Sequence, residues 1–466
     1  MRPLEFGIPL LLVIYLLFPR PRPFIIRALP AGALILTLIH FVTEGYRWQM
    51  IPLYVLTLAL ALVSMNKTWD MQPPVSYLTL RLAQGGALIL LAVSMAIPIL
   101  LPVPLIPVPS GPYQVGTRIY ELTDAERQEI YSGQEEARRF MIQVWYPSEA
   151  NSSEDRAPWM VDAEIFAPAI ATYIDMPAFF LDHLALVKLP AYHEPKVAAS
   201  NTAYPVILFS HGWNGFSAQN SSQAIQLASH GYVVIGIQHT YGAIITVFSD
   251  GTVAKNNPSA LPEGTATEEY ETAAHILSEQ WAGDLGLTLD YMGLHNNNPD
   301  SPFYTLLDLS RVGVYGHSTG GGAAIKFCGK DLRCKAVLGM DPFMRPVSTA
   351  VIENGLSQPA FFMFSQRWAD DLDSRNNQLF RKFIPHVKQS SGVITINGTA
   401  HYDFTDIPLL SPLAPWLGLK GPINGELIVT IVNDYLLSFF DMTLKGGSTN
   451  LFDGQNSTYS EVRVNQ

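Results

Sequence analysis

Four long apolar stretches fill the first 109 residues and constrain the fold of this part of the chain more than any other feature. The last is longer than the ~20 apolar residues that cross a bilayer, and the other three are short enough to need flanking residues. Two or three spans, or a cleaved signal peptide, are the alternatives, but one signal peptide leaves three stretches unexplained. The sequence predicts about four transmembrane helices, at Phe6–Phe18, Ala28–Val42, Ile51–Met65 and Leu82–Val108.

The charges between these stretches predict their orientation. Positive residues favour the cytoplasmic side of a membrane. The first connection holds three arginines and the third holds two cations, whereas the second holds one arginine beside Glu44. We therefore expect a multi-pass protein of the cell membrane whose N-terminus and residues 110–466 lie outside the cytoplasm. The two ionisable residues within the spans, Glu5 and His40, are expected at the interface. The cations of the three connections are Arg20, Arg22 and Arg27; Arg47; and Lys67 and Arg81.

Residues 110–466 form the second predicted domain. Proline is frequent over Ile99–Gly116, which predicts an extended, semi-rigid linker that lifts this domain off the bilayer. The net charge of −11 argues against a nucleic-acid partner. The two cysteines, Cys328 and Cys334, form no C-x-x-C pair, which excludes a zinc ribbon or thioredoxin-like site. They could close a disulfide in an oxidising compartment; the alternative is two reduced thiols near a helix end.

From Tyr120 onward the hydrophobic pattern alternates between strands and helices. Such alternation predicts an α/β fold with a mostly parallel sheet covered on both faces. The stretch Thr240–Thr265 shows no such regularity. The expected strands are Phe140–Tyr146, Tyr204–Ser210, Tyr232–His239, Val312–Gly316, Ala336–Met340, Pro359–Phe364 and Val393–Ile396. The expected helices are Ser217–Ser229, Thr267–Leu294, Thr319–Cys328, Leu379–Val387 and Glu426–Leu444.

A G-x-S-x-G motif at residues 316–320 follows one expected strand and precedes a helix. That context is the one in which the nucleophile elbow of an α/β-hydrolase fold occurs, with the serine on a strained turn above the sheet. We therefore expect Ser318 to be a nucleophile. The alternative is a glycine-rich turn without chemistry.

A serine hydroxyl needs a base to accept its proton and an acid to orient that base. In this fold the acid and the histidine follow the serine in that order. His401 follows an expected strand, whereas the rival His386 lies within a helical stretch, so we expect His401 to be the base. Asp341 ends a buried strand and is the expected acid. Its rivals, which we expect to cap a helix, are Asp370, Asp371 and Asp373.

The oxyanion of the reaction needs two backbone donors. One is the N–H of the residue after the nucleophile, Thr319. The other comes from the loop after the strand Tyr204–Ser210, where Trp213 is the expected donor. We expect His211 to hold this loop rather than to take part in the chemistry. No metal or organic cofactor is required.

These motifs together resemble the platelet-activating factor acetylhydrolase family, in its plasma or type II branch. The resemblance runs from about Gly111 to Asp441 and implies calcium-independent hydrolysis of short or oxidised acyl esters of phospholipids. It also implies the triad Ser318, Asp341 and His401. The motifs are VWYPSE, FSHGWNGF, LASHGYVVIGIQH, VYGHSTGGGAAI, RCKAVLGMDPF and INGTAHYDFTD.

The chain departs from the plasma branch in its membrane-spanning front end. The irregular stretch Thr240–Thr265 could shape the acyl pocket, so the sequence leaves the substrate open. An extracellular lipase or cutinase-like polyesterase is the first alternative, and an acyltransferase using the same acyl-enzyme is the second. A catalytically dead membrane sensor is the third alternative, and it fits poorly because the serine, acid, histidine and glycines are all present.

Overall fold

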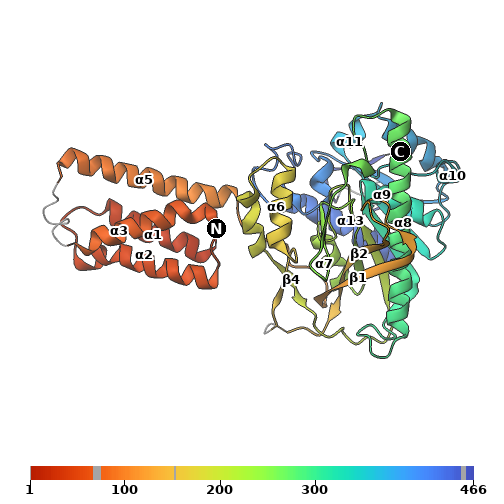
Figure 1. The fold of residues 1–466 in the computed structure, drawn as a ribbon, viewed down its shortest axis with the longest axis horizontal. Coiled ribbons are helices and arrows are strands. Elements are labelled where there is room, and N and C mark those ends of the chain that lie inside the picture. The colour runs from red at the N-terminus through yellow and green to blue at the C-terminus, as the bar shows by residue number, and fades with distance from the viewer. Residues whose placement is uncertain (1, 67–74, 152–153, 453–457, 466) are drawn as a thin grey trace.

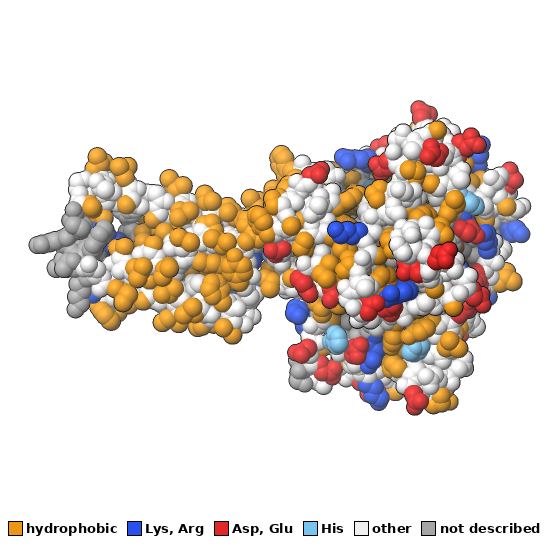
Figure 2. Space-filling view, in the orientation of Figure 1, with side chains coloured by type: hydrophobic (Ala, Val, Ile, Leu, Met, Phe, Trp, Pro, Cys, Tyr) orange, Lys and Arg blue, Asp and Glu red, His pale blue; other side chains and the backbone are white. Residues whose placement is uncertain are grey.

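The computed structural model describes residues 2–66, 75–151, 154–452 and 458–465. A slender helical bundle and a larger α/β region lie end to end along the long axis of the molecule (Figure 1). In the face shown in Figure 2, the bundle is covered by hydrophobic side chains, whereas the α/β region carries charged groups of both signs. The two parts therefore present surfaces suited to different solvents.

The helices of the bundle are apolar and expose much of that surface. Phe24–Thr43, the continuous segment Trp48–Met65 and Tyr77–Leu100 are each long and apolar enough to cross a membrane, whereas α1 is shorter, at 15 residues. A fourth helix of sufficient length, Gly425–Lys445, has 50% of its apolar window buried and packs inside the α/β region instead. The bundle consists of α1 (Pro3–Leu17), α2 (Phe24–Thr43), η1 (Trp48–Met50), α3 (Ile51–Met65) and α5 (Tyr77–Leu100).

The last apolar stretch is only partly helical. The prediction of a span over Leu82–Val108 was wrong at both ends, because α5 begins at Tyr77 and ends at Leu100. Pro102 and Pro104 follow directly, and proline disfavours helix at its own position and at the residue before it. Ile106 instead packs into the core of the α/β region. Of the charges used to orient the spans, Lys67 lies outside the described residues.

The α/β region sits directly against the bundle, so the two parts are joined by side-chain contacts as well as by the linker. The Trp48 indole N–H donates to the carbonyl of Phe180 at 3.2 Å, and Gln49 Nε2 lies 2.7 Å from His183 Nδ1. On the other side, the Ser411 hydroxyl donates to the carbonyl of Leu100. These contacts involve segments far apart in the chain, which no local sequence pattern reveals.

The described residues of the α/β region contain one 11-stranded sheet, with strands in the order β13-β12-β11-β10-β9-β5-β6-β2-β1-β4-β3. The stretch from β12 to β6 is parallel, whereas β2 pairs antiparallel with both β6 and β1. The mostly parallel sheet is therefore confirmed, with antiparallel additions at its edges. The strands are β1 (Gln114–Gln128), β2 (Ala137–Ser148), β3 (Arg156–Pro158), β4 (Lys188–His193), β5 (Tyr204–Ser210), β6 (Val233–Gln238), β9 (Leu307–His317), β10 (Cys334–Met340), β11 (Pro359–Ser365), β12 (Gln389–Ile396) and β13 (Val462–Asn465).

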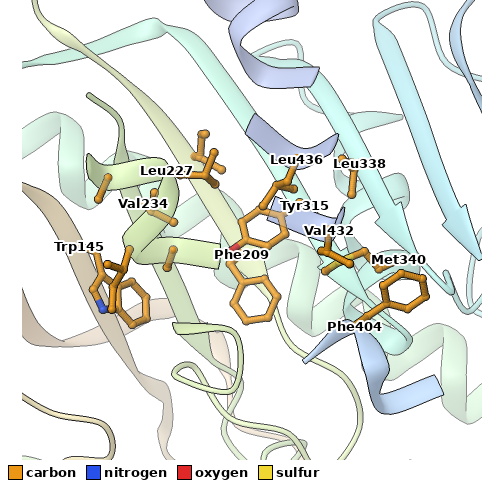
Figure 3. Packing of buried hydrophobic residues seen from close by; sticks show 14 of the residues in the cluster. Trp145, Phe209, Leu227, Val234, Tyr315, Leu338, Met340, Phe404, Val432 and Leu436 are labelled. Carbon is orange, nitrogen blue, oxygen red and sulfur yellow. The ribbon is translucent and has the colours of Figure 1, made fainter. Parts of the chain in front are cut away.

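Helices cover both faces of this sheet. Residues of α7 and α13 pack on one face with Phe209 and Tyr315, as Figure 3 shows around Leu227, Val432 and Leu436. Residues of α8, α9 and α12 pack on the other. The helices are α6 (Ala163–Tyr173), η2 (Ala178–Leu186), α7 (Ser221–Ser229), α8 (Thr267–Asn297), α9 (Thr319–Cys328), α10 (Thr349–Asn354), α11 (Gln366–Asp370), α12 (Arg375–Phe383), η4 (Ile384–His386), η5 (His401–Phe404), η6 (Ile407–Leu409) and α13 (Gly425–Lys445).

Two local predictions needed correction. The helix expected over Leu379–Val387 begins earlier, because the Ser374 side chain caps it by accepting from Asn377 N–H. The expected cap by the aspartates before it was therefore wrong. The stretch Thr240–Thr265 is not featureless: it forms a small two-stranded hairpin and a 3₁₀ turn, β7 (Ile245–Val247), β8 (Val253–Lys255) and η3 (Pro258–Ala260).

Cys328 and Cys334 are joined by a disulfide that links the end of α9 to the start of β10. Closing a loop with a sequence separation of six residues removes unfolded-state entropy. We expect the double variant Cys328→Ser/Cys334→Ser to lose about 2 kcal/mol of unfolding free energy. Chemical denaturation in detergent, with and without reductant, measures the loss. A wild-type protein equally stable in both conditions would contradict a structural role for the bond.

Candidate active site

Ser318 occupies the sharp turn between β9 and α9. Its backbone has φ 55° and ψ −121°, a strained conformation that L-residues rarely adopt. The turn is held by its neighbours, because Ser318 N–H donates to Met340 O at 3.0 Å and Phe343 N–H donates to Ser318 O at 2.9 Å. The serine side chain thus stands at the carboxyl edge of the sheet, half-buried, at the N-terminus of α9.

The glycines of the motif are required by close approach of the backbone. A Cβ on Gly320 would lie 2.0 Å from Ser210 O, and one on Gly316 would lie 2.3 Å from Gly320 O. Neither neighbour can move, because both are backbone atoms. At both positions a side chain would therefore clash with the backbone, which explains why the motif has glycine there.

The structure brings His401 and Asp341 together from two different strand ends. Asp341 follows β10 and is fully buried, and His401 begins η5 after β12. His401 Nδ1 lies 3.0 Å from Asp341 Oδ2. With Nδ1 directed at the carboxylate, the proton on that nitrogen leaves Nε2 as the acceptor.

Burial sets the protonation of this pair. Burial lowers the pKa of His401 to about 3, so the imidazole is neutral at neutral pH and can accept a proton. Burial raises the pKa of Asp341, and two hydrogen bonds from Ser365 oppose that rise. The Ser365 N–H donates to Oδ1 at 2.8 Å and the Ser365 hydroxyl donates to Oδ2 at 2.6 Å. The two groups lie so close that they titrate as a pair.

The imidazole of His401 lies beside the nucleophile turn. Its ring centroid is 4.4 Å from that of His317, the residue before Ser318, and 4.2 Å from Trp368 on its other side. His317 Nε2–H donates to the carbonyl of His401 at 2.9 Å. Within the described part of the chain no hydrogen bond joins the Ser318 hydroxyl to the His401 ring. Such bonds commonly tighten only when substrate is bound.

Two backbone N–H groups near Ser318 are uncommitted. Thr319 is the first residue of α9, and the first N–H groups of a helix have no partner within it. Among the described residues no acceptor pairs with Trp213 N–H, although the next two residues, Asn214 and Gly215, both donate. A Cβ on Gly212 would lie 3.2 Å from Ser318 Cβ, so the Trp213 loop lies against Ser318. The two N–H groups are therefore available to an oxyanion.

The rivals considered in the sequence lie elsewhere. His386 ends η4 at the entry to β12, the opposite end of that strand from His401, and is exposed. The side chains of Asp370, Asp371 and Asp373 are on the surface around α11 and α12. The direction of β12 thus places His386 at the edge of the sheet opposite Ser318, whereas the three aspartates follow the carboxyl end of β11 but are exposed to solvent.

Two residues of the site were missed in the sequence. His317 supports the backbone of His401, and Ser365 holds Asp341. His317 occupies a variable position of G-x-S-x-G, so the motif gives no signal for it. Ser365 ends β11, the strand next to β10, whose end carries Asp341. Because the ends of neighbouring parallel strands lie side by side, its position in the sequence could have identified it as a partner of Asp341.

A cleft of about 1040 Å³ opens next to the Trp213 loop. Residues of α6 line this cleft together with residues between 244 and 263, so the irregular stretch contributes to it. Tyr173 of α6, which lines the cleft, lies close to Tyr402, the neighbour of His401.

One cluster elsewhere has the donor types of a metal site. Ligand atoms of Glu5, His40 and Glu44 lie within 4.8 Å of one another in the bundle. Two guanidinium groups already supply positive charge there, since Arg47 pairs with Glu5 at 2.8 Å and Arg2 with Glu44 at 3.9 Å. The cluster is buried at the end of the bundle facing the α/β region, and its donor set does not favour a cation.

The chain matches the family model described as "Platelet-activating factor acetylhydrolase, isoform II" over residues 102–281 and 295–460. It is 30% identical to a platelet-activating factor acetylhydrolase of Cavia porcellus over 372 residues, covering 76% of this chain and 80% of that protein. It is 26% identical to a probable 1-alkyl-2-acetylglycerophosphocholine esterase of Arthroderma benhamiae, and the match covers 77% of this chain and 93% of that protein.

Among solved structures, a ferulic acid esterase from Streptomyces cinnamoneus matches with a TM-score of 0.64 and 24% identity. The match covers 78% of this chain and 99% of that one. This likeness concerns the fold, and the α/β-hydrolase fold expected from the motif is confirmed. The bundle lies outside the residues matched by the family model.

Proposed function

Because this chain belongs to the platelet-activating factor acetylhydrolase isoform II family and is an ester hydrolase, we propose that it cleaves short or oxidised acyl esters of phospholipids. The observation that carries the proposal is the strained backbone of Ser318 beside the paired side chains of His401 and Asp341. In that pair, His401 Nδ1 lies 3.0 Å from Asp341 Oδ2. The two relatives named for acetyl-ester hydrolysis support this substrate class. We assign catalysis to residues 110–466 and membrane attachment to residues 1–109.

The reaction proceeds through an acyl-enzyme. Ser318 Oγ attacks the ester carbonyl while its proton passes to His401 Nε2, and Asp341 stabilises the resulting imidazolium. The N–H groups of Trp213 and Thr319 bind the oxyanion of the tetrahedral intermediate. The bond between the acyl carbon and the alkoxy oxygen then breaks as the carbonyl re-forms, and His401 gives the proton to the departing alcohol oxygen. Water attacks the acyl-serine by the same steps, releases the acid and restores the Ser318 hydroxyl.

The position of the bundle supports hydrolysis at the outer surface of a membrane. The connection that carries Arg20 and Arg22 lies at the end away from the α/β region, as the course of α1 and α2 in Figure 1 shows. By the preference of cations for the cytoplasm, the α/β region then lies outside. Trp416, 88% exposed, lies in the same loop as Ser411, which bonds to Leu100 at the end of α5. Tryptophan is enriched at membrane–water interfaces, so this loop fits contact with headgroups.

A series of p-nitrophenyl esters of increasing acyl length, assayed in detergent, tests the substrate class. We expect activity on short acyl chains and little on long ones, because the family members named above act on acetyl esters. A preference for long chains would favour a lipase or cutinase-like enzyme and contradict the proposal. Product analysis with an added alcohol acceptor distinguishes transfer from hydrolysis, since a transferase yields a new ester.

A further inference from the structure

A second serine–histidine–aspartate chain lies beneath the active site. Ser210 Oγ is 2.8 Å from His239 Nε2, and His239 Nδ1 is 2.9 Å from Asp284 Oδ2. All three side chains are fully buried, and the backbone of Gly320 packs against the carbonyl of Ser210. Since no substrate can reach Ser210, this chain is not a second catalytic site, and its role must be sought in what it holds.

The charges of this chain fix the tautomer of His239. Burial alone would raise the pKa of Asp284, but the Arg138 guanidinium, at 2.6 and 2.8 Å, holds it well below its usual range. The carboxylate of Asp284 is therefore ionised and accepts a hydrogen bond from the Nδ1–H of His239. Burial lowers the pKa of His239, so the ring is neutral. Its Nε2 then accepts from the hydroxyl of Ser210.

The main chain of His239 in turn fixes His211. The His239 N–H donates to His211 Nε2 at 3.1 Å, which leaves the proton of His211 on Nδ1. That Nδ1–H donates to the carbonyl of Gly212 at 2.7 Å, and Gly215 N–H donates to the same carbonyl at 2.9 Å. Because the peptide unit is planar and trans, fixing the Gly212 carbonyl directs the N–H of Trp213 the opposite way. This N–H is the proposed oxyanion donor.

The turn after β6 binds the rest of the same loop. Asn214 N–H donates to Gly242 O at 3.0 Å, and Ile244 N–H donates to Gly215 O at 2.9 Å. The His239 carbonyl accepts from Gly242 at 3.0 Å, which closes the turn. Residues 211–215, here the oxyanion loop, therefore move only with residues 239–244. The side chain of His239 ties both segments to the buried Arg138–Asp284 pair.

We propose that His239 and Asp284 are positioning residues, which hold the oxyanion loop so that Trp213 N–H points at the carbonyl attacked by Ser318. This inference rests on the proposed function, because it assumes Ser318 as the nucleophile. A positioning role affects the transition state, in which the oxyanion forms, more than the binding of the uncharged ester. Its signature is a fall in kcat with little change in KM.

The test compares His239→Phe with the wild-type protein in detergent. Phenylalanine keeps a ring against Trp281, which stacks on His239 at 4.2 Å, but removes both ring nitrogens. We expect kcat per fluorophosphonate-titrated serine to fall on the order of 10²-fold, as when one oxyanion donor is lost. KM should stay within about threefold. The inhibition constant of a trifluoromethyl ketone, whose adduct carries the oxyanion, should rise in parallel with the fall in kcat/KM.

His239→Gln and Tyr232→Phe complete the design. Glutamine retains an amide donor for Asp284 and should recover part of kcat. Tyr232 lies at the opposite end of β6, and its buried hydroxyl bonds to Asp441 at 2.7 Å, so its variant controls for lost stability alone. If folded His239→Phe keeps the wild-type kcat per titrated serine, the proposal is overturned. The proposal is equally overturned if His239→Phe only has fewer titratable serines, each with the wild-type kcat. If His239→Phe does not fold, His239→Gln decides by the same criterion.

The test of the positioning role can fail independently of the test of the proposed function. A wild-type protein that neither reacts with the fluorophosphonate nor hydrolyses any ester in the series refutes the nucleophile itself. The positioning inference concerns only the ratio between variant and wild type, measured on whichever ester the wild type hydrolyses.

Discussion

Ser318→Ala is expected to lower kcat by about 10⁴- to 10⁶-fold, because without the hydroxyl no acyl-enzyme can form. The turn itself should persist, since the bonds that hold it at Met340 and Phe343 involve only the backbone of residue 318. KM should change little. The measurement is the initial rate on the best ester of the acyl series, together with the mass of the fluorophosphonate adduct on the peptide containing residue 318.

Ser310→Ala provides the matched control. Ser310 lies in the same strand, β9, and its hydroxyl bonds to Asp308 at the surface, far along the strand from the turn. We expect this variant to react and turn over as the wild type does. Residual labelling of Ser318→Ala at another serine, with activity retained, would show that the nucleophile lies elsewhere.

Asp341→Asn is expected to lower kcat by about 10⁴-fold while preserving the fold. The Ser365 N–H bonds to Oδ1 of Asp341, whereas Oδ2 faces both the Ser365 hydroxyl and His401, so an asparagine that keeps the first bond places its amide nitrogen toward His401. It then presents an N–H₂ donor to His401 in place of a carboxylate. The imidazole is left with a tautomer or an orientation unsuited to accept the proton of Ser318, and its cationic form is no longer stabilised. Steady-state kinetics with active-site titration measures the effect.

The surface aspartates supply the control for this change. Asp371→Asn and Asp373→Asn remove the same charge from exposed positions beside α12. We expect both to retain wild-type kcat, because neither carboxylate bonds to His401. A large loss in either variant, with Asp341→Asn active, would reverse the assignment of the acid and transfer it to the surface cluster.

The bundle contacts the α/β region close to one wall of the cleft. The Trp48 and Gln49 contacts are made to η2, the segment that follows α6. The helix α6 lines the cleft beside the Trp213 loop and packs with η2, so the bundle reaches this wall through η2. The position of α6 relative to the bundle therefore depends on these packing contacts as well as on the proline-rich linker.

The sequence by itself determined the features that depend on short-range physics. The apolar runs predicted the bundle helices, and the alternation of strand and helix patterns predicted the sheet. Glycines at 316 and 320 around Ser318 predicted the elbow, because that turn can form only where side chains are absent. Asp341 and His401 were identifiable because Asp341 directly follows one strand and His401 lies in the loop after another, and the ends of parallel strands meet at one edge.

Only the tertiary structure decided the contacts between segments distant in the chain. Ser365, His317 and the His239–Asp284 chain support the site through hydrogen bonds whose partners are 24 to 84 residues apart or belong to another strand. The docking of η2 on the bundle has the same character, with a separation of 134 residues between Gln49 and His183. Polar residues of this kind have no periodicity, since a hydrogen bond depends on the position of two atoms in space and leaves no pattern in the local sequence.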